Sequence, residues 1–106
     1  MEKKTVCVSL AALYDSYYGN NLPSGNRIEA SYCDSDTFRG GYYYDLYDKH
    51  GNLVCMDGEE CEVVYELSSR MYKFTNRNGE FDTTFYLTKE EVDEAVFFDT
   101  NAYHYC

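Results

Sequence analysis

The amino-acid sequence predicts an α+β fold: an antiparallel β-sheet built of hairpins, with one C-terminal helix packed on it. Three observations predict this fold. Several short segments alternate apolar with polar residues, glycine-containing polar turns separate them, and a helix signal follows the last segment. Because strands outnumber helices and the connections are short, a small, partly open β-barrel is the alternative. The 106 residues fit one compact domain spanning residues 1–106.

The first third of the chain predicts two strands separated by a loop. Residues 5–10, "TVCVSL", are β-branched and apolar, which is typical of a strand. Residues 11–18 predict a helical turn that ends at Gly19, and residues 19–26 collect glycine, proline, serine and asparagine in a loop. Residues 27–33, "RIEASYC", alternate apolar and polar side chains with period two and therefore predict a half-buried strand.

A cluster of tyrosines predicts a hairpin arm in the middle of the chain. Residues 42–47 alternate between the two faces of a strand, and residues 53–56 return as its partner after the turn "DKHGN", where Gly51 accommodates a positive φ. The face expected in the core carries Tyr42, Tyr44 and Leu46. The face expected toward water carries Tyr43, Asp45 and Tyr47.

The second half of the chain predicts further strands and then the helix. After a turn at residues 57–60, residues 61–67 alternate as a strand, and residues 71–87 form a hairpin with "NRNGE" at its tip. Thr88 is the N-cap of the helix, and Glu91, three residues later, completes a capping box.

The helix is amphipathic, with one apolar and one acidic face. The buried stripe is expected to be Val92, Ala95 and Val96, and Phe97 and Phe98 are expected to close the end of the core. The outer, anionic face is expected to carry Glu90, Glu91, Asp93 and Glu94.

The net charge of −10 excludes some partners and favours others. Binding to nucleic acid needs a basic surface, and an anionic membrane surface repels an acidic protein, so neither is expected as a direct partner. An acidic surface attracts basic proteins and accelerates their encounter, although many acidic proteins carry their charge for solubility alone. No segment approaches the length of a membrane span, and no export signal is evident, so the protein is expected in the cytoplasm.

The cysteines and histidines predict no metal, cofactor or catalytic site. The five cysteines are expected to be reduced thiols in a cytoplasmic protein, and none of their spacings matches a zinc knuckle. The cysteines are Cys7, Cys33, Cys55, Cys61 and Cys106. The two histidines, His50 at a hairpin tip and His104 in the C-terminal tail, are poorly placed for a rigid catalytic base, so the protein is not expected to be an enzyme.

The remaining constellation combines tyrosines with carboxylates. Carboxylates pair with lysine and arginine, tyrosines supply rigid contact area, and arginine stacks on tyrosine rings. The residues expected to bind a partner are Tyr43, Asp45, Tyr47, Asp48, Asp57, Glu59, Glu60, Glu62, Glu90 and Glu94. They predict a small binding protein that inhibits a basic, nucleic-acid-handling protein by imitating nucleic acid. One alternative is a structural or homodimeric interaction module, and a third hypothesis is a zinc-stabilised domain or a thiol enzyme.

The segment "YKFTNRNGEFDTTFYLTKEEVDEAVF", about a quarter of the chain, resembles the closing hairpin and helix of small acidic uncharacterised proteins encoded by bacterial phages and mobile elements. Genes of that kind often lie among counter-defence genes, including those of anti-CRISPR-like inhibitors. The resemblance implies an anti-defence setting for this protein. It assigns no functional residue.

Overall fold

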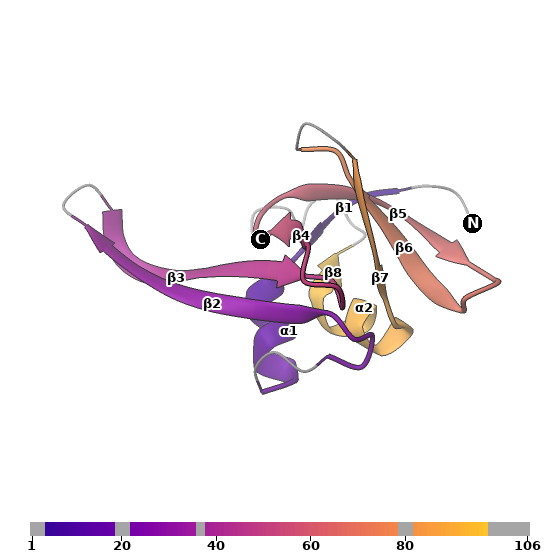
Figure 1. Cartoon of the computed structure of the whole chain (residues 1–106), viewed down its shortest axis with the longest axis horizontal. Coiled ribbons are helices and arrows are strands. Elements are labelled where there is room, and N and C mark those ends of the chain that lie inside the picture. The colour runs from indigo at the N-terminus through magenta and orange to yellow at the C-terminus, as the bar shows by residue number, and fades with distance from the viewer. Residues whose placement is uncertain (1–3, 19–21, 36–37, 79–81, 98–106) are drawn as a thin grey trace.

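The computed structural model describes residues 4–18, 22–35, 38–78 and 82–97, and it confirms the α+β fold. Two antiparallel sheets and two short helices enclose the core, and the sheets do not close into a barrel (Figure 1). Neither described helix has the length and apolar character needed to cross a membrane.

The larger sheet has five strands and the smaller sheet has three, and every strand pair is antiparallel. The larger sheet, in spatial order, contains β7 (Thr83–Leu87), β6 (Met71–Asn76), β5 (Glu60–Glu66), β1 (Lys4–Val8) and β8 (Val96–Phe97). The smaller sheet contains β2 (Arg27–Ser35), β3 (Phe38–Tyr47) and β4 (Leu53–Met56). Helix α1 spans Leu10–Ser16 and helix α2 spans Lys89–Ala95.

Helix α1 differs from the prediction in two ways. The sequence predicted a single helix, at the C-terminal end, and a first strand that reached residue 10. The strand β1 ends at Val8 because Ser9 is the N-cap of α1. The Ser9 hydroxyl accepts a hydrogen bond from the Ala12 amide at 3.3 Å, which satisfies one of the free donors at the helix start. The helical turn expected at residues 11–18 is therefore a two-turn helix, α1.

The second helix begins as the sequence predicts and ends earlier. The Thr88 hydroxyl accepts from the Glu91 amide, and the Glu91 carboxylate accepts from the Thr88 amide at 2.7 Å, so the capping box is confirmed. The helix stops at Ala95, and Val96 adopts extended backbone and pairs with Val8 as part of β8. Val96 is buried as expected, but from a strand, and Phe98 lies outside the described residues.

Glu91 also corrects the expectation that it faces water. Its side chain is 0% exposed, and one carboxylate oxygen accepts from the Thr88 amide. The other accepts from the Ser24 hydroxyl at 2.9 Å, which fastens the loop before β2 to α2. A buried carboxylate is costly unless it is hydrogen-bonded, and here both oxygens are.

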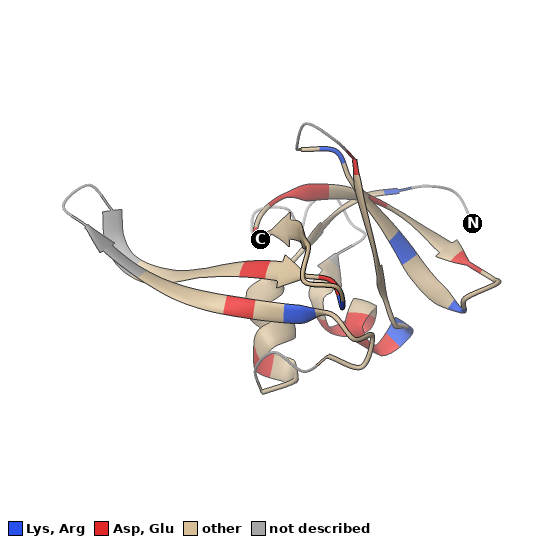
Figure 2. Cartoon of the chain, in the orientation of Figure 1, with Lys and Arg blue, Asp and Glu red and all other residues tan. Residues whose placement is uncertain are grey.

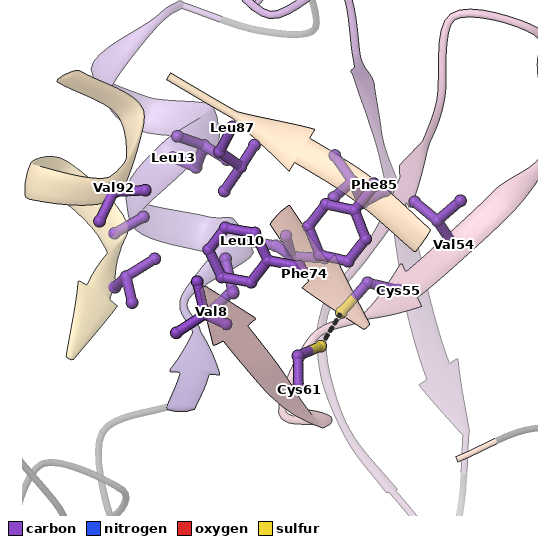
Figure 3. Packing of buried hydrophobic residues seen from close by; sticks show 14 of the residues in the cluster. Val8, Leu10, Leu13, Val54, Cys55, Cys61, Phe74, Phe85, Leu87 and Val92 are labelled. Carbon is purple, nitrogen blue, oxygen red and sulfur yellow. Dashed lines mark hydrogen bonds between the residues drawn. The ribbon is translucent and has the colours of Figure 1, made fainter. Parts of the chain in front are cut away.

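The core lies between the two sheets and the helices. Both sheets and both helices contribute to one cluster of buried apolar side chains, part of which is drawn in Figure 3. At its centre the rings of Phe74 and Phe85 stack with centroids 5.0 Å apart and planes 7° from parallel. Asn76, also buried, donates from its side chain to the Val54 carbonyl at 2.9 Å and so joins β6 to β4, the strands of different sheets.

The β2–β3 hairpin extends beyond this core. In Figure 1 it curves away from the rest of the molecule. The whole molecule is therefore elongated, with extents of 47, 29 and 29 Å along its three principal axes. At its base, Ile28 and Leu46 are directly opposite each other and fully buried. Farther along the hairpin the same face runs past the edge of the core. We call this hairpin the arm.

Candidate functional site

After Tyr18, which is 99% exposed, the two most exposed aromatic side chains of the described residues lie on the core-side face of the arm. Tyr32 and Tyr42 are cross-strand partners whose ring centroids are 5.4 Å apart, and they are 60% and 63% exposed. Tyr42 continues to Tyr44 at 6.5 Å, and Tyr44 continues to Tyr14 of α1 at 5.5 Å. These four residues, Tyr14, Tyr32, Tyr42 and Tyr44, form a continuous row of rings that we call the tyrosine ladder.

The tyrosine ladder corrects the expected division of the arm into a core face and a water face. The sequence pattern placed Tyr42 and Tyr44 in the core with Leu46. Leu46 is 0% exposed and Tyr44 is half-buried against the core, but Tyr42 is largely in water. The reason is strand length: β3 has ten residues, and on this face the described side chains become more exposed from Leu46 through Tyr44 to Tyr42. Alternation identifies a face and does not say how far the core reaches along it.

Carboxylates surround the buried end of the ladder. The pKa of the Tyr44 phenol is raised, first by burial and then by the negative charges of Asp15, the phenol of Tyr14, and Asp57. Asp15 is exposed on α1 beside Tyr14, and Asp57 is exposed in the turn between β4 and β5. Rings in water next to carboxylates form an environment that favours a guanidinium or ammonium group, because the rings and the acids attract the same cation.

The opposite face of the arm carries three of the predicted partner-binding residues. Tyr43 is 44% exposed, and Asp45 and Tyr47 are half-buried. The Arg27 guanidinium lies 5.1 Å from the centroid of the Tyr47 ring, and Arg27 also pairs with Glu29 at 3.5 Å. This face therefore already holds a cation of its own, whereas the tyrosine ladder is flanked by acids.

Asp48 organises the turn between β3 and β4. Its carboxylate accepts from the backbone amides of His50 and Asn52, each at 2.9 Å, and from the Asn52 side chain. These bonds, the Asn52 amide first, lower the pKa of Asp48 below its ordinary value. Gly51 takes the positive φ of +86° that the sequence predicts. Both Asp48 oxygens are used within the turn.

Asp57 and Glu59 hold the turn between β4 and β5. Asp57 accepts from the backbone amide of Leu10 at 2.9 Å, at the start of α1. Glu59 accepts from the Met56 amide at 2.7 Å and from the Asn76 side chain at 3.0 Å. Of this pair, only Asp57 lies near the tyrosine ladder.

The remaining predicted acids lie on β5 and α2. Glu60 is exposed on β5, and Glu62 is half-buried and pairs with Arg77 at 3.3 Å. Glu90 and Glu94 are exposed on α2, and Glu94 accepts from the Ser16 hydroxyl of α1 at 3.0 Å. Figure 2 shows that acidic residues are spread over both sheets and both helices. The ten predicted residues thus lie on β3, on β5, on α2 and in the turns on either side of β4, and they form no single cluster.

The chemistry of the cysteines and of the described histidine is limited. Cys7 is disulfide-bonded, which corrects the expectation that all five thiols are reduced. Cys55 and Cys61 are buried free thiols with sulfur atoms 3.9 Å apart, and the pKa of Cys55 is strongly raised, first by its hydrogen bond with Cys61 and then by burial (Figure 3). A protonated thiol is a poor nucleophile and a poor metal ligand.

No group of three or more His, Cys, Asp or Glu side chains that could hold a metal ion occurs among the described residues. His50 is exposed at the tip of the β3–β4 turn, and His104 lies outside the part of the chain that the structure describes. No protein-family model, curated protein or solved structure matches this chain.

Proposed function

We propose that this protein is a small acidic binding protein that inhibits a basic, nucleic-acid-handling protein, and that the tyrosine ladder is its contact surface. The observation that carries the proposal is the row of rings that runs from half-buried Tyr14 and Tyr44, near Asp15 and Asp57, to the exposed pair Tyr32 and Tyr42 on a projecting arm. Exposed aromatic rings of this extent are uncommon on a surface without a partner. The net charge of −10 selects a basic partner over an acidic one.

The inhibition follows from what a nucleic-acid site contains. Such sites combine lysine and arginine for the phosphates with surfaces on which bases stack. Carboxylates of the acidic protein take the place of phosphates, and the ladder rings take the place of bases. The protein needs no catalytic step, since occupation of the site is enough. Within this proposal it acts in the bacterial cytoplasm, in the anti-defence setting that the resemblance implies.

The test compares the two faces of the arm. The double variant Tyr32→Ser/Tyr42→Ser removes the exposed ladder, and Tyr43→Ser removes a ring from the opposite face. Each tagged protein is used to capture partners from nuclease-treated bacterial lysate, and each captured protein is then purified and assayed for nucleic-acid binding. The proposal expects wild type and Tyr43→Ser to retain a basic nucleic-acid-binding protein and to block its function. The double variant is expected to do neither.

The salt dependence of capture is the second part of the test. Raising the salt concentration from about 0.1 M to about 1 M shortens the screening length from about 10 Å to about 3 Å, so an electrostatic complex weakens strongly. Capture that is unchanged in high salt or by the double variant would overturn the proposal. Recovery of the protein alone, together with a dimer in light scattering, would support the homodimeric module instead.

A further inference from the structure

We propose that the open edge of β2 binds an extended basic segment of the partner, which adds to the three-stranded sheet as a fourth strand and lays its basic side chains on the tyrosine ladder. This inference rests on the proposed function and deepens it, because it specifies the shape of the ligand and how its backbone is held. The ligand is a strand with arginine or lysine at alternate positions.

The first observation is the unpaired edge. In the three-stranded sheet β2 pairs with β3, and no described strand pairs with its other side. Strand β2 has nine residues, and the irregularity in its pairing is confined to the far end, between Cys33 and Ser35. Edge strands are normally protected by proline, charged side chains or bulges. Residues 27–32 contain no proline and no register irregularity, and their two charged residues, Arg27 and Glu29, pair with each other on the face opposite the ladder. Its outward backbone groups are therefore ready to pair with an added strand.

The second observation is a hollow along this edge. A cavity of about 390 Å³ is lined by four consecutive residues of β2, Ile28 to Ser31, and by Tyr14 of α1. Ala30 lies between Ile28 and Tyr32 on the core-side face of the strand, and its small side chain leaves room beside the Tyr14 ring. An added strand would place one of its own side chains in this hollow, at the buried end of the tyrosine ladder.

The third observation is charge, which selects the occupant. Side chains on one face of an added strand lie next to Ala30 and Tyr32, since neighbouring strands are about 4.8 Å apart. Asp15, next to Tyr14, is the carboxylate on the ladder side of this edge. Glu29 lies on the other face of β2, where it pairs with Arg27 at 3.5 Å. A second copy of this chain would bring another net charge of −10 to the same edge. A basic segment of a partner can pair with the backbone of β2, contact the tyrosine rings and complement the negative charge at the same time.

The test uses synthetic peptides in place of the unidentified partner. A labelled peptide about ten residues long alternates arginine with threonine, a length that matches a typical strand. A second peptide has the same sequence with every backbone amide methylated, which removes its hydrogen-bond donors and keeps its charge. A third has the same composition with all arginines in one half. Binding is measured by fluorescence anisotropy at equal salt.

The expected result is that the alternating peptide binds at least about tenfold more tightly than the other two, the equivalent of about 1.4 kcal/mol. Equal, salt-sensitive binding of all three peptides would overturn strand addition and leave the proposed function standing, because charge alone would then explain the binding. Absence of binding by all three would also overturn the inference. The capture experiment tests the proposed function separately.

A protein variant checks the location. Ala30→Leu fills the hollow beside Tyr14 without changing charge, and it is expected to weaken the alternating peptide at least about tenfold. Thr84→Leu is the matched control, since Thr84 is exposed on β7, the edge strand of the other sheet. The melting temperature of each variant shows whether it is folded. If folded Ala30→Leu binds like wild type, or if Thr84→Leu weakens binding equally, the β2 site is wrong.

Discussion

Two hairpins of this protein contain the same pair of residues in different surroundings. In the arm, Tyr32 faces Tyr42 across the strands, and in the β5–β6 hairpin Tyr65 faces Tyr72. Their ring centroids are 5.4 Å and 5.0 Å apart, and both pairs are T-shaped, with interplanar angles of 69° and 66°. The arm pair is largely in water, whereas the β5–β6 pair is half-buried, with Tyr72 packed against the core.

The comparison shows that the geometry of a tyrosine pair and its exposure to water have different causes, which the alternation pattern of a strand does not distinguish. Antiparallel register sets how the two rings meet, and it is a local property of each hairpin. Exposure depends on whether another element covers the face. Helix α2 packs against β6, whereas the exposed end of the arm extends past α1. The same pair is therefore covered in one hairpin and exposed to water in the other.

The largest expected effect tests whether the β5–β6 hairpin carries the stability. Phe74 on β6 is fully buried and stacked on Phe85. Phe74→Ala should lower the free energy of unfolding by about 3–5 kcal/mol, because it removes a large buried ring and leaves a cavity. Chemical denaturation measures this change. A loss below about 1 kcal/mol would mean that the core is not centred on this hairpin.

Asn76 tests the connection between the β5–β6 hairpin and the sheet of the arm. Its buried side chain donates to the Val54 carbonyl and to Glu59. Asn76→Ala should cost about 1–3 kcal/mol, because a buried side chain loses two hydrogen bonds worth about 0.5–1.5 kcal/mol each, while the Val54 carbonyl keeps the Thr83 hydroxyl as a donor. Denaturation monitored by tyrosine fluorescence measures the loss. Thr84→Ala, at an exposed position of β7, is the control and should cost less; equal losses would contradict a special role for Asn76.

The tyrosine pairs provide the most direct comparison. Tyr72→Ser should destabilise the protein by about 1–2 kcal/mol, because it exposes apolar surface that the ring covers. Tyr42→Ser in the arm should cost less than about 1 kcal/mol, since the ring is already in water and loses mainly its cross-strand contact. Thermal unfolding of both variants measures the difference. If Tyr42→Ser is the more destabilising change, the arm face is covered in solution.

The smallest effect is a pH dependence at the base of the arm. The pKa of Asp48 is lowered in the folded protein, so its contribution to stability is present above its unfolded pKa of about 3.9 and is lost as the pH falls through the folded value. Asp48→Asn should therefore lose part of the acid sensitivity that wild type shows below about pH 4. Melting temperatures at pH 6 to 2 measure this loss, with exposed Asp93→Asn as the control. Parallel curves for wild type and Asp48→Asn would contradict the role of Asp48.

Much of the local structure could be predicted from the sequence. The Thr88 capping box, the Gly51 turn and the alternation at Ile28 and Leu46 are all confirmed. Each depends on residues close together in the chain or directly paired, so a short sequence window contains its cause.

The candidate site could be predicted only in part. The sequence identified a tyrosine strand and acidic surroundings as the informative features. It predicted partner contacts on the face of Tyr43, Asp45 and Tyr47, which stays a prediction, whereas the exposed ladder lies on the other face of that strand. Tyr14 joins the ladder from α1, although it is distant in the sequence from the ladder tyrosines of β2 and β3. The open edge of β2 has no sequence signal either. Which strands become edges depends on pairing between distant segments.

Periodicity, turn chemistry and composition act locally or additively, so they were enough to predict the kinds of element, their alternating faces and the strongly negative charge. The division of the strands into two sheets, the burial of Glu91 and the extension of the arm beyond the core came from the fold alone. These features depend on contacts between segments that are far apart in the chain, which no short stretch of sequence contains. A tyrosine is core or surface according to what packs on it.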